Sequence, residues 1–123
     1  MSFFNDHMLD LALSYIDTAT TRLDICSAEP ATFAQATSTF SLGNKTGISV
    51  GAPADRSPTG RQVTIAAVTD GTVTANGTAA WWALSDTVNS RLIAAQTIAT
   101  PKAVVTGSPW TIDAITIGIP DPA

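Results

Sequence analysis

The chain offers few side chains that could take part in catalysis. Its 123 residues include one histidine, His7, and one cysteine, Cys26, and charged residues make up 13% of the sequence. Nucleophilic or acid–base catalysis needs a reacting group, a proton acceptor and neighbours that tune the pKa of both. So small an inventory does not readily supply such a set. We therefore expect a protein that is not an enzyme, that needs no cofactor and that works by contact.

The acidic residues do not form a recognisable metal or phosphate site. Asp10, Asp17 and Asp24 recur every seven residues, but this spacing does not bring oxygen ligands to one point, as a metal site requires. We interpret them as solvated carboxylates. The stretch 55–61 lacks the glycine and lysine spacing of a phosphate-binding loop. Cys26 lies in an alternating apolar run, which is typical of a small buried side chain.

Charge and hydropathy exclude two classes of partner. The net charge is −4 and the six basic residues are scattered along the chain, whereas nucleic-acid binding draws its affinity from clustered Lys and Arg. No run approaches the ~20 apolar residues of a membrane-spanning helix. Residues 1–10 carry no basic residue followed by an apolar run, so we expect no secretory signal and synthesis in the cytoplasm of the producing cell.

One amphipathic helix is predicted over residues 5–18. Asn5 or Asp6 can cap its start. The predicted apolar face consists of Met8, Leu9, Ala12, Leu13 and Ile16, opposite Asp10, Ser14 and Asp17. This face is expected to pack either on the core of its own domain or on a neighbouring subunit.

The segment after the helix changes character at Pro30. Residues 20–27 are rich in β-branched residues and predict a strand, which Glu29 and Pro30 end. From residue 31 to residue 60 the sequence is small, polar and rich in glycine and proline. A segment of this length with only short strand signals predicts an extended arm or contact loop.

The main β region is predicted over residues 61–119. Short alternating runs are separated by turn signals such as Asp70-Gly71 and Asn76-Gly77, and Pro101 interrupts a later run. The chain is therefore expected to form a single domain of the mainly β class. Its predicted architecture is a β-sandwich or small barrel of six to eight short antiparallel strands, preceded by the N-terminal helix.

The adjacent Trp81 and Trp82 are the strongest candidates for an interaction site. Neighbouring strand residues point to opposite faces, so one indole can enter the core while the other faces a partner or a covering loop. Exposed aromatic residues also serve as stacking platforms for sugars and as anchors in protein interfaces. We predict Trp81, Trp82 and Trp110 as candidate interface residues.

The order of elements resembles that of small structural proteins of tailed bacteriophages. The resemblance rests on the helix at 8–16, Ser27-Ala28-Glu29-Pro30, the run Gly60-Arg61-Gln62-Val63-Thr64, the Trp-containing strand ending at Asp86, and the closing segment from Val105-Thr106-Gly107 to Ile117-Gly118-Ile119-Pro120. It extends over essentially the whole chain. It implies a β-rich, oligomeric or arrayed protein attached to the virion, and it brings no catalytic residues.

The expected function is therefore that of a virion structural protein, most specifically a capsid decoration or cement protein that binds phage coat subunits. A neck, head-fibre or tail accessory protein is the alternative within this class. A carbohydrate-binding β-sandwich for host adsorption is the alternative from another class. The expected partners are coat or other virion proteins and further copies of the chain, in a homo-oligomer or array.

Overall fold

The computed structural model describes residues 5–19, 22–57 and 59–120. Where the sequence predicts a single domain, the contacts within the chain fall into two compact units. The smaller unit is built from the segments Met1–Ala19, Ser49–Ala67 and Asp113–Ala123, and the larger unit from Thr20–Ile48 and Val68–Ile112. Each unit therefore joins segments that are far apart in the sequence.

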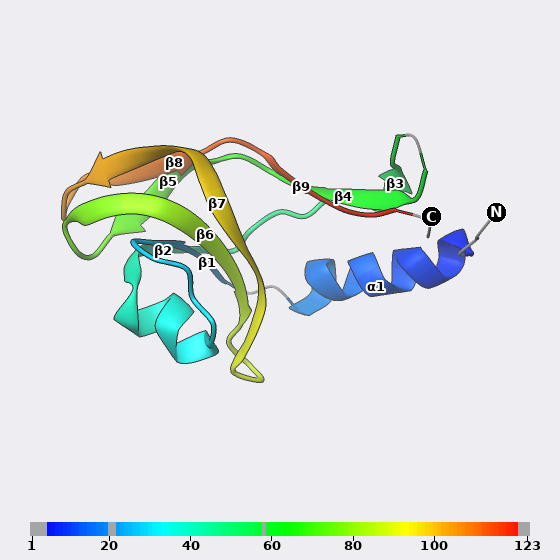
Figure 1. Ribbon diagram of the computed structural model, residues 1–123, viewed down its shortest axis with the longest axis horizontal. Coiled ribbons are helices and arrows are strands. Elements are labelled where there is room, and N and C mark those ends of the chain that lie inside the picture. The colour runs from blue at the N-terminus through cyan, green and yellow to red at the C-terminus, as the bar shows by residue number, and fades with distance from the viewer. Residues whose placement is uncertain (1–4, 20–21, 58, 121–123) are drawn as a thin grey trace. The chain divides into compact units, whose positions relative to one another are not determined.

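The smaller unit combines the N-terminal helix with a short sheet (Figure 1). Its elements are α1 (Asp6–Ala19), β3 (Ala54–Asp55), β4 (Arg61–Ile65) and β9 (Ile115–Ile119). Among the residues that the structure describes, the sheet has three antiparallel strands in the order β3-β4-β9. An antiparallel bridge between Val50 and Ile65 extends the contacts of β4 on the β3 side.

Helix α1 forms almost where the sequence predicts it. Asn5 caps the helix, because its side-chain Oδ1 accepts a hydrogen bond of 2.8 Å from the backbone N–H of His7. The helix packs against β4. It buries Leu9, Leu13 and Ile16, which lie about one helical turn apart and form one stripe.

The larger unit holds the longer sheet and a π-helical turn. Its elements are β1 (Arg22–Cys26), η1 (Gln35–Thr39), β2 (Ser41–Thr46), β5 (Val68–Val73), β6 (Gly77–Asp86), β7 (Arg91–Val104) and β8 (Pro109–Ile112). Within the described part of the chain, the sheet has six antiparallel strands in the order β7-β6-β1-β2-β5-β8.

The predicted fold class is confirmed. The structure is mainly β, its strands are antiparallel, and one helix precedes them. Of the two architectures predicted from the sequence, the closed barrel is not formed, because both sheets of the described residues are open, with separate strands at their two ends.

Strand β1 lies in the interior of the larger sheet, and its residues suit this position. It is paired on both sides, with β2 and with β6. Leu23 and Ile25 on one face and Asp24 and Cys26 on the other are all buried. The segment η1 contacts β1, β2 and β6, and its buried Ala36 packs with Cys26.

The predicted extended arm over residues 31–60 is wrong for its first half. Residues 35–39 form η1, and residues 41–46 form β2, which lies inside the larger sheet between β1 and β5. The sequence indicates only a short strand here, over residues 39–42, because the following Gly43 is disfavoured by β-propensity. A Cβ at Gly43 would meet the Trp110 ring and the Thr72 carbonyl, so close packing requires glycine here.

The hairpin of β6 and β7 is the longest pairing in the larger unit (Figure 1). The pairs Ala79 with Lys102 and Trp81 with Thr97 flank a bulge, in which β7 has residues 98–101 where β6 has Ala80. Pro101 lies in this bulge. It is tolerated because β7 is an edge strand and because a bulge already interrupts the hydrogen-bond ladder.

Candidate functional site

The three tryptophans predicted as interface residues have different environments. Trp82 and Trp110 are buried, with 5% and 3% of their surface exposed. Trp81 is partly buried and packs against the cluster of Cys26, Ala36 and Ala83. The sequence argument that neighbouring indoles face different surroundings therefore holds. Contrary to their prediction as interface residues, Trp82 and Trp110 are too buried to form exposed anchors. The interface role of Trp81 stays a prediction.

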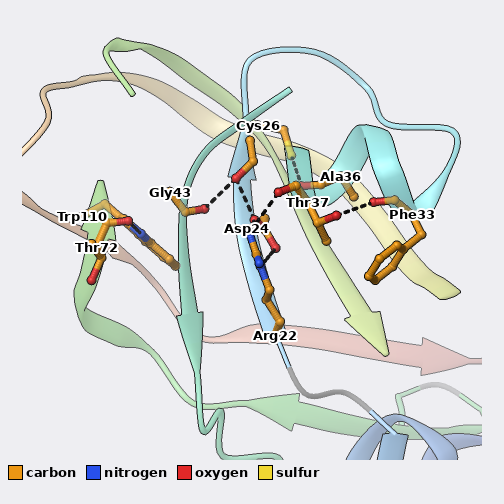
Figure 2. A network of polar contacts seen from close by, with 10 residues as sticks. Arg22, Asp24, Cys26, Phe33, Ala36, Thr37, Gly43, Thr72 and Trp110 are labelled. Atoms are coloured by element: carbon orange, nitrogen blue, oxygen red, sulfur yellow. Dashed lines mark hydrogen bonds and ion pairs between the residues drawn. The ribbon is translucent and has the colours of Figure 1, made fainter. Parts of the chain in front are cut away.

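Trp110 is held from two sides within the larger unit. Its Nε1–H donates a hydrogen bond of 3.1 Å to the Thr72 carbonyl (Figure 2). Its ring lies against Gly71, where a Cβ atom would collide with the indole. The indole is therefore a packing element with its polar atom satisfied, as buried tryptophans usually are.

Asp24 forms the centre of a polar network on the η1 side of the larger sheet (Figure 2). Its carboxylate accepts two hydrogen bonds of 2.7 Å from the Nε and Nη2 of Arg22. The Ser41 hydroxyl donates a third, also of 2.7 Å. Arg22 Nη2 also donates to the Thr37 carbonyl at 3.1 Å, so the network joins β1, β2 and η1.

This network corrects the interpretation of Asp24 as a solvated carboxylate. The side chain is completely buried, and Arg22 is 24% exposed. A buried carboxylate is stable only when it is paired and hydrogen-bonded, and both conditions are met here. Because its partners all come from this chain, we assign the network a structural role.

Cys26 is a buried free thiol, as predicted. Burial is the main cause that raises its pKa to about 12, with a smaller contribution from the charge of Asp24. Its Sγ donates to the Ala36 carbonyl at 3.5 Å. A thiol with this pKa is not deprotonated at neutral pH, so it is not a nucleophile.

A second polar cluster ties the smaller unit together around Arg61. The guanidinium contacts Asp10 of α1 through Nε at 2.7 Å and Asp55 of β3 through Nη1 at 2.6 Å. The hydrogen bonds that the guanidinium donates to these two carboxylates, first of all to Asp10, raise the pKa of Arg61 above its ordinary value. Asp10 is thus an ion-pair partner that joins the helix to β4, and the prediction that it is solvated is wrong.

Helix α1 carries a second apolar stripe, which is covered only in part. Met8, Leu11 and Tyr15 are exposed by 48%, 61% and 40%, and their spacing of three and four residues places them along one side of the helix. Ala12 adjoins them and is also exposed. We call Met8, Leu11, Ala12 and Tyr15 the α1 stripe.

The α1 stripe corrects the predicted face of the helix. The apolar face predicted from the sequence includes Met8 and Ala12, which are exposed, and omits Leu11 and Tyr15. The sequence does contain a signal for a second apolar stripe, because the apolar positions of this helix cover a wider arc than one packing face needs. Among the large hydrophobic residues of the described chain, those exposed outside α1 are Val88 and Val105, so the α1 stripe is where such residues gather.

The absence of a metal site, expected from the sequence, stays a prediction. Within them, no three side chains of His, Cys, Asp or Glu converge in a way that could hold a metal ion. No helix of the described chain has the length and hydropathy needed to cross a membrane. His7 is exposed in the first turn of α1.

Comparison with known proteins gives no relative for this chain. No protein-family model, no curated protein and no solved structure matches it.

Proposed function

We propose that this protein is a non-enzymatic structural protein of a tailed-phage virion, most specifically a decoration protein that binds coat subunits on the head. The observation that carries the proposal is the α1 stripe. Large apolar side chains are rarely gathered on the surface of a monomer unless that surface binds something. The order of elements along the chain, which resembles small phage structural proteins, supports the choice of partner.

The chemistry of the α1 stripe favours a protein partner. Met8, Leu11 and Tyr15 have the spacing with which a helix inserts its anchors into an apolar groove. Asp10 is turned toward Arg61 and therefore away from the stripe. A groove on a coat subunit could cover these side chains without burying an unpaired carboxylate, which would be costly.

A weak contact of this kind suits a decoration protein. Many identical subunits on one shell bind with high total strength even when each contact is weak, because binding is multivalent. A neck, head-fibre or tail accessory protein would use the same stripe on a different virion protein. The number of copies on each particle distinguishes these locations.

The first test is mass spectrometry of particles purified from a lysate of cells that carry this gene. A decoration protein is expected in a copy number comparable with that of the major coat protein. A copy number that is a small fraction of this would assign the protein to the neck, fibre or tail. Particles that lack the protein would overturn the proposal.

The second test asks whether the α1 stripe makes the contact. Leu11→Gln should weaken binding to particles that lack the protein by about tenfold or more, because a Leu side chain loses ~1.5 kcal/mol of burial. Asp17→Gln is the matched control, since it places the same side chain on an exposed position of the same helix outside the stripe. Cosedimentation with particles measures both variants, and equal binding by both would exclude the stripe as the contact.

A further inference from the structure

Strand β9 is an edge strand without the features that usually protect an edge. Its sequence, Ile-Thr-Ile-Gly-Ile, has no charged residue and no proline, and Pro120 follows only after the strand has ended. In the described part of the chain it pairs with β4 alone, residue for residue from Ile115 to Ile119. Exposed edges are commonly blocked by Lys, Pro or a bulge, because their free backbone groups attract another strand.

The hydrogen bonds of β4 show which groups of β9 point away from the sheet. The Thr64 carbonyl accepts a bond of 2.9 Å from the Gly51 N–H, on the side of β4 opposite β9. In an antiparallel pair the N–H and C=O of one residue point to the same side. Thr64 and its cross-strand neighbour Thr116 are therefore a pair without hydrogen bonds between them.

It follows that the N–H and C=O of Thr116 point outward at the open edge. Because the pattern repeats every second residue, those of Gly118 point outward as well. The edge thus presents a donor and an acceptor at each of two alternate positions. Ile117 lies between them, with its own backbone groups toward Val63 on β4.

We propose that β9 pairs antiparallel with β9 of a second copy of this chain, about a two-fold axis at Ile117. In this register Thr116 lies opposite Gly118 of the partner subunit, and Gly118 opposite Thr116 of the partner subunit. Each of these pairs exchanges two backbone hydrogen bonds. A shift of the register toward the strand end would place Pro120, which has no N–H, opposite one of these residues.

The side chains of β9 fit a second copy. Ile117 and Ile119 share the face of Val63 and Arg61, which is the face toward α1, because Arg61 binds Asp10 of that helix. Both isoleucines are only partly buried, and the same residues of the partner would cover them further. No like charges meet in this pairing. A two-fold pairing is also closed, so it forms a dimer and not a fibre.

The pairing joins the two small sheets into one continuous sheet. It goes beyond the proposed binding to particles and does not depend on it, since the surface is the β9 edge and not the α1 stripe. Failure of particle binding therefore leaves the dimer untouched, and the reverse also holds.

Cysteine cross-linking of the full-length chain tests the register. In a Cys26→Ala background, Ile117→Cys places the two new thiols directly opposite each other in a pair whose Cα atoms are ~4.5 Å apart, a separation that a disulfide can span. The expected product under mild oxidation is a covalent dimer. Thr116→Cys in the same background is the control, since its two copies are displaced diagonally and are expected to stay largely uncross-linked.

Sedimentation of the wild-type chain over a range of concentrations tests the dimer itself. We expect a concentration-dependent dimer that Thr116→Pro abolishes, because proline removes an outward donor that the fold does not use. Far-UV circular dichroism checks that the Thr116→Pro variant stays folded. If this variant unfolds, the cross-linking experiment alone tests the register. A wild-type chain that remains monomeric, or a dimer that Ile117→Cys fails to cross-link, would overturn the proposal.

Discussion

The two units of this protein differ in how their sheet edges are protected. In the larger unit, edge strand β7 carries the bulge at 98–101 together with Pro101 and Lys102, and the other edge, β8, is short and begins at Pro109. In the smaller unit, edge strand β9 is regular and uncharged. The same unit exposes the α1 stripe. The other edge of the smaller sheet, β3, is only two residues long and carries Asp55. The comparison shows that three of the four sheet edges carry features that discourage association and that the β9 edge does not.

The interiors differ as well. The larger unit buries a charged network around Asp24 whose hydrogen bonds are supplied by its own strands and by η1. The smaller unit buries apolar side chains between one helix and a short sheet and places its ion pairs on Arg61 near the surface. We therefore expect the larger unit to be sensitive to the loss of a polar partner and the smaller unit to the loss of apolar volume.

The largest effect is expected for Asp24→Ala. This change leaves Arg22 and Ser41 without their shared partner in a buried site, which should lower the free energy of unfolding by about 4 kcal/mol. Urea unfolding followed by tryptophan fluorescence measures it. Asp70→Ala is the control, because it removes the exposed ion pair with Lys45 and should cost less than about 1 kcal/mol. Equal costs for both changes would contradict the structural role of the network.

Leu13→Ala is expected to have the next largest effect. Leu13 is 1% exposed, whereas Leu11 on the same helix is 61% exposed. Leu13→Ala should therefore cost about 3 kcal/mol through the cavity it leaves, and Leu11→Ala less than about 0.5 kcal/mol. Urea unfolding by far-UV circular dichroism, with hydrogen exchange to locate the loss in α1 and β4, measures both. A cost for Leu11→Ala as large as that for Leu13→Ala would contradict the exposed position of Leu11.

The smallest effect concerns the pH dependence of the larger unit. Asp86 accepts hydrogen bonds from the Asn89 side chain and from the N–H groups of Asn89 and Val88, and these bonds lower its pKa below its ordinary value of 3.8. A carboxyl whose pKa is lower in the folded state contributes stability above its unfolded pKa and loses it as pH falls through its folded pKa.

The measurement for Asp86 is the difference in stability between wild type and Asp86→Asn as a function of pH. This difference should be constant near neutral pH and shrink below about pH 4. The comparison between the two proteins removes the contribution of the other carboxyl groups. A difference that does not change with pH would show that the carboxylate form of Asp86 is not favoured by folding.

The sequence predicts the elements that have a strong local signal. The helix at 5–18 and the strands around Leu23 and Trp82 are found within a few residues of their predicted positions, because their capping and alternation are local properties. The predicted hairpin turn at Asp70-Gly71 is wrong. These residues lie within β5, where the missing side chain of Gly71 makes room for the Trp110 ring. Trp110 is far from Gly71 in the sequence, so the residues around Gly71 alone do not indicate this contact.

The candidate surfaces could be predicted only in part. An apolar helix was evident from residues 8–16, but the stripe it leaves open depends on which side β4 covers, and Arg61 decides this by binding Asp10. The open edge of β9 depends on strand order, which pairs β9 with a strand some fifty residues earlier. The burial of Trp110 likewise depends on Gly71 and Thr72, which lie about forty residues earlier in the sequence.

The smaller unit is built from three separate segments of the chain, so its elements are synthesised at different times. Helix α1 is made first, yet β4 and β9, which complete the unit, follow much later, and β9 comes after every strand of the larger unit. On the ribosome, β9 is therefore the last strand to be made, shortly after β8 completes the larger sheet. Domains generally fold as units as they emerge, so the smaller unit, and with it the β9 edge, forms only when nearly the whole chain has been made.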